Sequence, residues 1–256
     1  MSMTYSEYLR VEELLKLQSP KSQEHDEMLF IVIHQVYELW FKQILHEAGH
    51  LQCSLEGNQV PAVNATLSRI LEILKVMVHQ IDILETLTPI NFLSFRSRLE
   101  SASGFQSVQF REFEFRLGHR GADRIQKLPE HAKPHLEKIM TQDSLYDSFL
   151  KMLAVRGYQV PKALTARNRA EDHKPCQEFH AELIRLYKTD STLAAICERL
   201  VDLDEGLQEW RYRHVKMVER TIGFKRGTGG SPGAEYLRQT LFKPLFPDLW
   251  DIRTAL

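Results

Sequence analysis

The segment from Asp26 to Glu56 carries an apolar face too wide for an ordinary surface helix. Its large apolar and aromatic residues recur three and four positions apart: Phe30, Ile33, Tyr37, Trp40, Phe41, Ile44 and Leu45. This spacing predicts a helix, and the width of the face predicts that the helix is central and contacted on several sides. Gly57 and Asn58 are expected to end it.

Further helices are expected on both sides of this segment. Apolar residues in a nearly heptad order follow Pro61 as far as Leu84, so this helix is expected to pair antiparallel with the first. Another long helix is predicted from Thr192 to Ile222, with Gly223 as its C-cap. Because strand-like alternation is nearly absent, we expect an all-α fold, a single helical bundle formed by residues 1–256.

Shorter and weaker elements complete the predicted bundle. A capping box at Thr4 and Glu7 predicts a short N-terminal helix through Leu15. Short helices are expected at 91–99 and 106–117 and around Tyr236, whereas the more polar region 118–174 is expected to hold weak helices and loops.

Composition restricts the partners that the chain can take. The 33 Lys and Arg residues balance 34 Asp and Glu residues, and a net charge of −1 gives no basic field for nucleic acid or anionic lipid. The three cysteines are far apart, which argues against a disulfide framework. The start of the chain lacks a secretory pattern, and the longest apolar run is too short to cross a bilayer. We therefore expect a soluble cytoplasmic protein without nucleic-acid or membrane partners.

Two histidines lie on the apolar stripes of two separate long helices. His34 follows Phe30 by one turn and precedes Tyr37 and Phe41 on the same face. His214 occupies the corresponding place on the last long helix. Each alone fits a core histidine bonded to a carbonyl, but together they indicate a cofactor pocket between helices, where neutral imidazole is a common iron ligand.

An arginine and a glycine-rich loop are further candidates. Arg96 follows Phe92 and Phe95, so its guanidinium either extends to solvent or points along an apolar wall at a carboxylate. Thr228 lies in the loop 227–233, which lacks the order of a phosphate-binding loop. A helix connector or a mobile lid over a pocket explains this loop better.

The sequence also contains a literal zinc-protease signature, H-E-x-x-H, at His46, Glu47 and His50. The extended form of the motif is missing, Gly49 weakens the helix, and no strand is available to pair with a peptide substrate. We therefore treat a zinc hydrolase as a minor alternative.

Four ordered motifs give the chain a resemblance to a known family. They are HDEMLFIVIHQVYELWFK (25–42), LETLTP (84–89), SGFQSVQFR (103–111) and WRYRHVKMVERTIGFKRGTGGSPG (210–233). Over nearly its whole length the chain resembles the tryptophan 2,3-dioxygenases, a family of tetrameric haem enzymes. The resemblance, rather than periodicity or composition, implies haem b (iron protoporphyrin IX) between the long central helices.

The resemblance implies a role for each cavity residue. His214 would be the proximal ligand of haem iron, and His34, on the distal side, would meet the indole N–H of the substrate. Phe30 would pack against the indole ring, and Ser103 would belong to the distal haem pocket.

The same resemblance implies which residues bind the amino-acid end of the substrate and which contact a neighbouring subunit. Arg96 would bind the substrate carboxylate, and Thr228 would hold the ammonium and carboxylate end. The N-terminal segment 1–19 would be an intersubunit arm of a homotetramer, a dimer of dimers, whose residues Tyr5, Tyr8 and Leu9 reach into a neighbouring subunit's pocket.

Two residues depart from the family pattern. Phe92 stands where many bacterial members have a tyrosine, which would add a hydroxyl to the carboxylate site. Pro232 replaces the second serine of the usual loop, and this change removes a backbone donor and stiffens a segment expected to close over substrate.

The predicted reaction is the insertion of dioxygen across the indole C2–C3 bond of L-tryptophan, which gives N-formyl-L-kynurenine, the first step of tryptophan degradation by the kynurenine pathway. His34 would orient the indole without being an obligatory base. The nearest alternative is a sister haem mono-oxygenase or hydroxylase acting on another aromatic amino acid or an indole acid. A zinc hydrolase and a non-catalytic helical interaction module are the alternatives from other classes.

Overall fold

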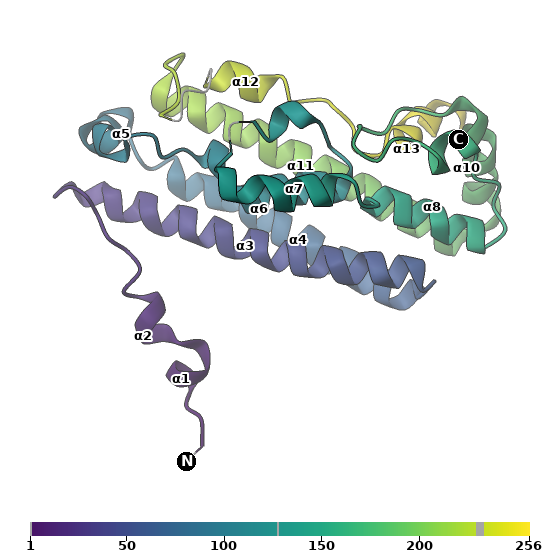
Figure 1. Ribbon diagram of the computed structural model, residues 1–256, viewed down its shortest axis with the longest axis horizontal. Coiled ribbons are helices and arrows are strands. Elements are labelled where there is room, and N and C mark those ends of the chain that lie inside the picture. The colour runs from purple at the N-terminus through teal and green to yellow at the C-terminus, as the bar shows by residue number, and fades with distance from the viewer. Residues whose placement is uncertain (1, 127, 229–232) are drawn as a thin grey trace.

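Helices are the only regular elements in the part of the chain that the structure, a computed structural model, describes: residues 2–126, 128–228 and 233–256 (Figure 1). The α-helices are α1 (Tyr5–Leu9), α2 (Val11–Leu14), α3 (His25–Glu56), α4 (Val60–Leu84), α5 (Pro89–Arg96), α6 (Val108–Leu117), α7 (Lys133–Met140), α8 (Leu145–Val155), α9 (Lys162–Thr165), α10 (Gln177–Thr189), α11 (Ser191–Ile222), α12 (Ala234–Arg238) and α13 (Pro247–Asp251). The expected all-α fold is confirmed.

Three long helices, α3, α4 and α11, lie side by side and form the centre of the bundle (Figure 1). A short turn at 57–59 joins α3 to α4, so the two run antiparallel, as the sequence predicts. Helices α4 and α11 approach closely at Gly206, where an added Cβ would lie 3.5 Å from the Leu74 side chain. Their facing side chains, among them Leu67, Ile70 and Leu207, are almost fully buried.

The region 118–174 is more ordered than its polar sequence suggests. Helix α8 is buried almost throughout and packs against α3, so the expectation of only weak helices there is wrong for α8. Its polar residues are buried because they cap the helix: the Ser144 side chain accepts a hydrogen bond from the Asp147 backbone, and Asp147 accepts one from the Ser144 backbone at 2.8 Å. Helix α10, which packs on α11, was not predicted.

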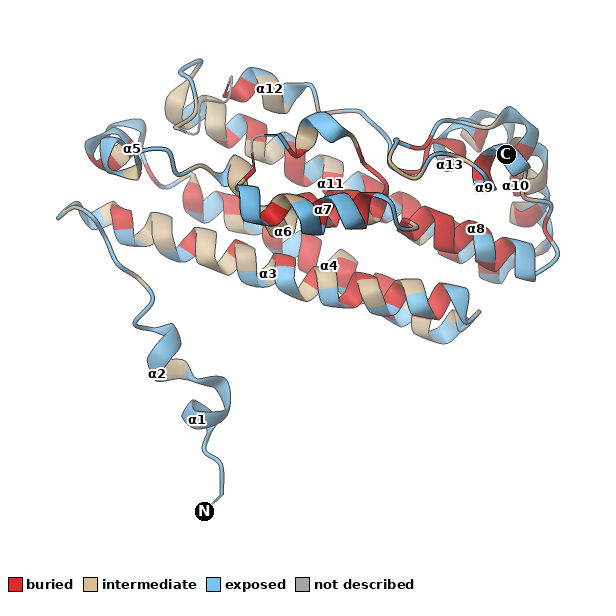
Figure 2. Cartoon of the chain, in the orientation of Figure 1, coloured by how far each residue is buried: buried red, intermediate tan, exposed pale blue. Residues whose placement is uncertain are grey.

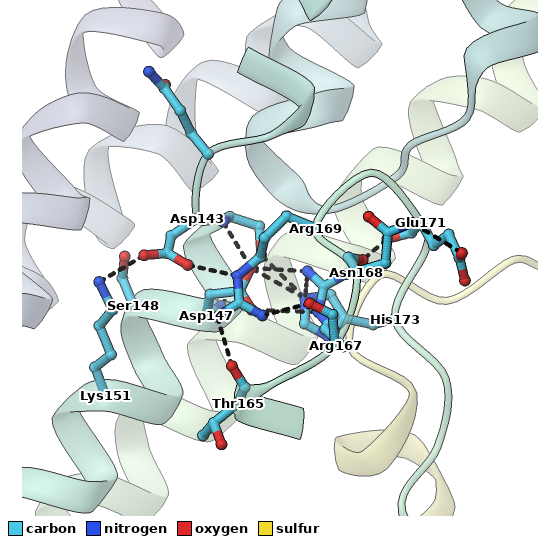
Figure 3. Close-up of polar contacts among 12 residues, drawn as sticks. Asp143, Asp147, Ser148, Lys151, Thr165, Arg167, Asn168, Arg169, Glu171 and His173 are labelled. Carbon is cyan, nitrogen blue, oxygen red and sulfur yellow. Dashed lines mark hydrogen bonds and ion pairs between the residues drawn. The ribbon is translucent and has the colours of Figure 1, made fainter. Parts of the chain in front are cut away.

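A buried polar cluster fixes the loop 165–173 against the start of α8 (Figure 3). Arg167 donates to Asp147 at 2.8 Å and to Nε2 of His173 at 2.8 Å. Since a guanidinium only donates, His173 Nε2 must be the unprotonated nitrogen. The Ser144 hydroxyl lies 2.6 Å from Asp147, whose carboxylate accepts from it directly. The same hydroxyl lies 3.1 Å from His173 Nε2, and together these contacts hold the loop 165–173 against the start of α8.

The N-terminal segment lies away from the bundle (Figure 2). The short helix predicted through Leu15 is divided into α1 and α2 because Arg10 adopts a left-handed conformation with φ of 51°. Tyr5 and Tyr8 are 77% and 74% exposed. No buried residue occurs in either helix, so neither helix packs into the core of the bundle.

Among the described helices, none combines the length and the apolar character needed to cross a membrane.

Candidate active site

A cavity of about 270 Å³ lies between α3, α4, α5, α6 and α11, and we call it the central cavity. Residues from the segments 102–107, 227–228 and 233–240 also contribute to its wall. The apolar lining includes Phe30, Tyr37, Phe41, Ile81, Leu84, Leu87, Phe92, Leu99, Phe105, Phe110, Trp210, Val215, Met217, Val218, Ile222 and Leu237. A largely apolar wall with a few polar groups is typical of a cofactor or substrate pocket.

His214 projects from α11 into the central cavity. Its ring lies parallel to that of Trp210, one turn earlier, with an interplanar angle of 3° and centroids 5.2 Å apart. Tyr37 and Phe41 pack edge-on against Trp210 and hold it in place. Within the described part of the chain, no hydrogen bond engages the His214 ring. Burial, and to a lesser degree the nearby His34, lowers its pKa to about 4, so the imidazole is neutral at physiological pH.

These properties of His214 fit an axial ligand of haem iron. A metal ligand must be an unprotonated nitrogen with a free lone pair, and a buried imidazole without a hydrogen-bond partner provides one. The largely apolar wall suits a porphyrin, and haem iron in oxygen-binding proteins is commonly held by one such histidine.

His34 faces the same cavity from α3. Its Nδ1 lies 2.7 Å from the backbone oxygen of Phe30, one turn earlier. Because a carbonyl only accepts, Nδ1 carries the proton, and in the neutral ring Nε2 keeps its lone pair. Burial lowers the pKa of His34, although the Phe30 carbonyl and the Glu38 carboxylate act in the opposite direction. The neutral ring therefore presents an acceptor at Nε2.

A cluster of aromatic rings lies beside the His34 side chain. The ring of Phe30 lies 4.1 Å from that of His34, measured between centroids, and 5.7 Å from that of Phe92. Phe92 and Phe95 of α5 pack edge-on, with centroids 5.5 Å apart. These rings form a wall suited to a flat aromatic ligand. The structure thus places Phe92 in the cavity lining, where its ring offers no hydroxyl.

Arg96, Ser103 and Thr228 also line the central cavity, although they are far apart in the sequence. Arg96 forms no ion pair with any described carboxylate, and it donates instead to the backbone oxygen of Arg226 at 2.5 Å. Thr228 donates to the backbone oxygen of Ala102. Both contacts tie the loop that follows α11 to the segment around α5. Ser103 caps the turn at 104–106 and accepts from the Phe105 backbone.

Not every predicted site residue lies at this cavity. Tyr5, Tyr8 and Leu9 are not part of its lining, because α1 lies far from the bundle of its own chain (Figure 1). Pro232 lies outside the described residues.

The H-E-x-x-H sequence does not form a metal site. Glu47 turns toward α4, where Arg69 donates to both of its carboxylate oxygens at 2.9 and 3.1 Å. His46 and His50 are exposed on α3. In the described part of the chain, no group of three or more histidine, cysteine or acidic side chains is arranged to bind a metal. The zinc-hydrolase alternative therefore loses its structural basis.

The sequence reasoning did not identify three charged residues in the cavity wall. Arg111 and Glu114 of α6 and Arg211 of α11 are buried and line the cavity. A signal was available, since Arg111 precedes the buried Phe115 by one turn, and Arg211 precedes the buried Val215 by one turn. A charged residue on a buried stripe is uncommon unless it is paired.

Comparisons with known proteins identify the family of the chain. A sequence model of the family described as tryptophan 2,3-dioxygenase matches residues 1–143 and 157–256. A tryptophan 2,3-dioxygenase of Anaeromyxobacter sp. (strain K) is 53% identical over 257 residues, covering 100% of this chain and 97% of the relative. The enzyme of that name from Herpetosiphon aurantiacus is 53% identical, with coverage of 100% and 99%. One from Pseudomonas fluorescens is 39% identical, with coverage of 100% and 92%. The chain therefore belongs to the tryptophan 2,3-dioxygenase family.

Proposed function

We propose that the chain performs the reaction of its family in the central cavity, where His214 would hold the iron of haem and His34 would face the substrate. The protein is a haem-dependent tryptophan 2,3-dioxygenase, and its substrates are L-tryptophan and dioxygen. When bound, haem supplies the ferrous iron that activates dioxygen. The main observation in support of this proposal is that two neutral histidines from different helices face one apolar cavity.

Different residues of the cavity bind the two ends of the amino acid. The rings of Phe30 and Phe92 enclose the indole, and the Nε2 lone pair of His34 accepts its N–H. Arg96 binds the carboxylate with its guanidinium, and Thr228 offers a hydroxyl to the ammonium and carboxylate end. Holding both ends of tryptophan fixes the C2–C3 bond in one place, and such positioning contributes several kcal/mol to catalysis.

The apolar wall also excludes water from the reacting bond. Aromatic and aliphatic side chains around the indole would leave few groups that could donate a proton near the reacting bond. His34 acts by orientation, because its Nε2 accepts the indole N–H and the C3 carbon of indole is nucleophilic without losing that proton.

Labelled dioxygen tests the reaction directly. With ¹⁸O₂ and L-tryptophan, we expect N-formyl-L-kynurenine carrying two heavy oxygen atoms, because dioxygenation inserts both atoms of one molecule. Mass spectrometry of the freshly quenched product measures the incorporation. A product with one labelled oxygen would instead support the sister mono-oxygenase or hydroxylase.

Loss of the proposed hydrogen bond between His34 and the indole N–H should have a measurable effect on catalysis. We expect His34→Ala to lower kcat/KM for L-tryptophan by about tenfold, the loss of roughly one hydrogen bond in a buried site. A substrate methylated at the indole nitrogen, which cannot donate, should lose much less on the same substitution. Steady-state kinetics with both substrates measure the difference, and equal losses would show that His34 does not meet the indole nitrogen.

The same bond gives an expected pH dependence. Protonation of Nε2 would remove the acceptor, but the pKa of His34 is lowered by burial. Tryptophan binding should therefore be constant above the ordinary histidine pKa of about 6.5 and weaken only below it.

The N-terminal arm, residues 1–19, is proposed to complete the pocket of a neighbouring subunit in a homotetramer. Its exposed aromatic and aliphatic side chains include Met3, Tyr5, Tyr8, Leu9, Leu14, Leu15 and Leu17. So many exposed apolar side chains on one segment are typical of an interaction surface. We also propose a cytoplasmic location, which cell fractionation would test.

Subunit mixing tests the arm. We expect Tyr8→Ala and Arg96→Gln each to be nearly inactive, since one damages the arm and the other the pocket. When the two variants are co-expressed, mixed tetramers would contain some pockets with an intact arm and an intact arginine. Activity should then recover to a fraction of the wild-type value, measured on material purified through two different tags. Recovery would fail if the arm served only its own subunit.

A further inference from the structure

One carboxylate in the wall of the central cavity, that of Glu38, is not used by the proposed reaction. Glu38 follows His34 by one turn of α3, and both residues line the cavity. Because residues four positions apart share one face of a helix, the carboxylate and the imidazole are neighbours on the cavity side of α3. The Glu38 side chain is half-buried.

Gln109 of α6 fixes the carboxylate of Glu38. Its side-chain amide donates to Oε2 of Glu38 at 2.8 Å and to the backbone oxygen of the same residue at 2.9 Å. Arg96, Arg111 and Arg211, which also line the cavity, have other partners. Among the described residues no cation forms an ion pair with Glu38, so a negative charge remains uncompensated in a largely apolar wall, where it is unfavourable.

A purely structural role accounts for the amide but not for the charge. The hydrogen bond from Gln109 to the backbone oxygen of Glu38 already joins α6 to α3. A glutamine at position 38 would accept the second hydrogen bond as well, because its side-chain carbonyl is also an acceptor. The charge of Glu38 therefore indicates an effect on a neighbouring group of the cavity.

His34 is the neighbour on which this charge acts. Its Nδ1 donates to the backbone oxygen of Phe30, so only Nε2 is left to accept a hydrogen bond from a ligand. Burial lowers the pKa of His34, and the Phe30 carbonyl and the negative charge of Glu38 oppose this effect. Glu38 thus makes the imidazole more basic than burial alone would leave it.

Other titratable groups face the cavity from the elements around His34. They are Tyr37 of α3, Arg96 of α5, Arg111 and Glu114 of α6, Arg211 and His214 of α11, and Tyr236 of α12. Helix α4 contributes the apolar side chains of Ile81 and Leu84. Of the charges at this cavity, the one that shifts the pKa of His34 is that of Glu38.

From this arrangement we propose that Glu38, fixed by Gln109, is a positioning residue whose carboxylate strengthens Nε2 of His34 as the acceptor of the indole N–H. A negative charge beside the imidazole increases the attraction between the Nε2 lone pair and the partial positive charge of the donated hydrogen. The inference rests on the proposed function, in which His34 meets the indole nitrogen. Glu38 acts through His34 and not by contact with the substrate.

Glu38→Gln keeps the size of the side chain and its acceptor for Gln109 but removes the charge, and two opposite effects are expected. At neutral pH, where Nε2 is unprotonated, the weaker acceptor should raise Kd for L-tryptophan about threefold, roughly half of the effect of deleting the hydrogen bond. In acid, loss of the carboxylate lowers the pKa of His34 further. Nε2 then stays unprotonated to lower pH, so tryptophan binding should persist to lower pH than in wild type.

Titration of the ferrous holoprotein with L-tryptophan without oxygen, followed by visible absorption at a series of pH values, measures both effects. The substrate methylated at the indole nitrogen carries the same amino-acid charges but has no N–H, so its Kd should be unchanged by Glu38→Gln. Glu72→Gln is the matched control, because Glu72 is exposed on α4 and outside the cavity lining. This control should have the wild-type affinity and pH profile.

The pH profile separates the proposed role from a general disturbance, which would weaken binding at every pH. An acid profile of Glu38→Gln equal to that of wild type would overturn the inference, and so would an equal loss for the methylated substrate. Should Glu38→Gln fail to fold, as judged by circular dichroism, Gln109→Lys decides. An ammonium in place of the Gln109 amide would neutralise the same charge, so both effects should appear, and their absence would also overturn the inference.

His34→Ala separates this inference from the proposed function. If His34→Ala weakens the binding of L-tryptophan and of its methylated form equally, His34 does not meet the indole nitrogen, and the proposed contact itself is wrong. If His34→Ala affects L-tryptophan alone while Glu38→Gln behaves as wild type, that contact stands and only the role of Glu38 is wrong.

Discussion

Replacement of His214 by alanine should abolish the histidine-ligated haem spectrum and reduce activity by more than about a hundredfold. Removing even an outer partner of a metal ligand typically costs 10- to 100-fold in affinity or activity, and the axial ligand itself should cost more. His214 has a neutral ring and no hydrogen-bond partner among the described residues, so the substitution leaves no buried polar group unpaired. We therefore expect the bundle to remain folded while the iron loses its protein ligand.

The spectrum of the ferrous protein and its haem content measure this result. His46→Ala is the matched control, because His46 is exposed on α3 and should leave both unchanged. Added imidazole fills the space of the deleted ring and should restore part of the spectrum of His214→Ala. A wild-type spectrum in the alanine variant would mean that another side chain holds the iron.

Arg96→Gln should lower kcat/KM for L-tryptophan by about 30- to 150-fold, which corresponds to about 2–3 kcal/mol for a charged hydrogen bond to the carboxylate. In the structure this guanidinium has a backbone oxygen as its partner and no carboxylate among the described residues, so its charge is available to the substrate. Steady-state kinetics over a range of tryptophan concentrations measure the loss.

Two controls separate recognition of the carboxylate from a general disturbance. Arg98→Gln changes an exposed arginine two positions away and should behave as wild type. Tryptamine, which lacks the carboxylate, should bind weakly to both wild type and Arg96→Gln, with little difference between them. A large loss for tryptamine as well would assign Arg96 to the structure of the loop rather than to the substrate.

Much of the bundle can be predicted from the sequence, because its long helices have continuous apolar stripes. The ends of α3 and α11 lie within a residue of the expected positions, where glycines and a short polar turn interrupt the pattern. Helix α8 could not be predicted in the same way. Its N-cap Ser144 and its first-turn residues Asp147 and Ser148 suggest a surface. They are internal because the loop around Arg167 covers Asp147 and because Glu56 of α3 accepts a hydrogen bond from Ser148.

The histidines of the site can be predicted because each interrupts an apolar stripe. Arg111 and Arg211 do so as well, but an arginine on such a stripe is more often a residue that extends to solvent. Their burial depends on Glu114, which reaches both from one position, and no local pattern indicates that α6 and α11 meet there. The periodicity of apolar residues gives no information on contacts between helices that are far apart in the sequence.

The proton on His34 is fixed by the backbone. The proton on Nδ1 of His34 is accepted by the backbone carbonyl of Phe30. This carbonyl belongs to the helix and is present whatever side chain stands at position 30. Substitutions in the aromatic wall, at Phe92 for example, can therefore reshape the central cavity without changing the tautomer of His34. Mutagenesis of the wall can for this reason alter the substrate range while Nε2 of His34 remains a hydrogen-bond acceptor. Designed libraries can vary the wall residues as long as position 34 remains histidine.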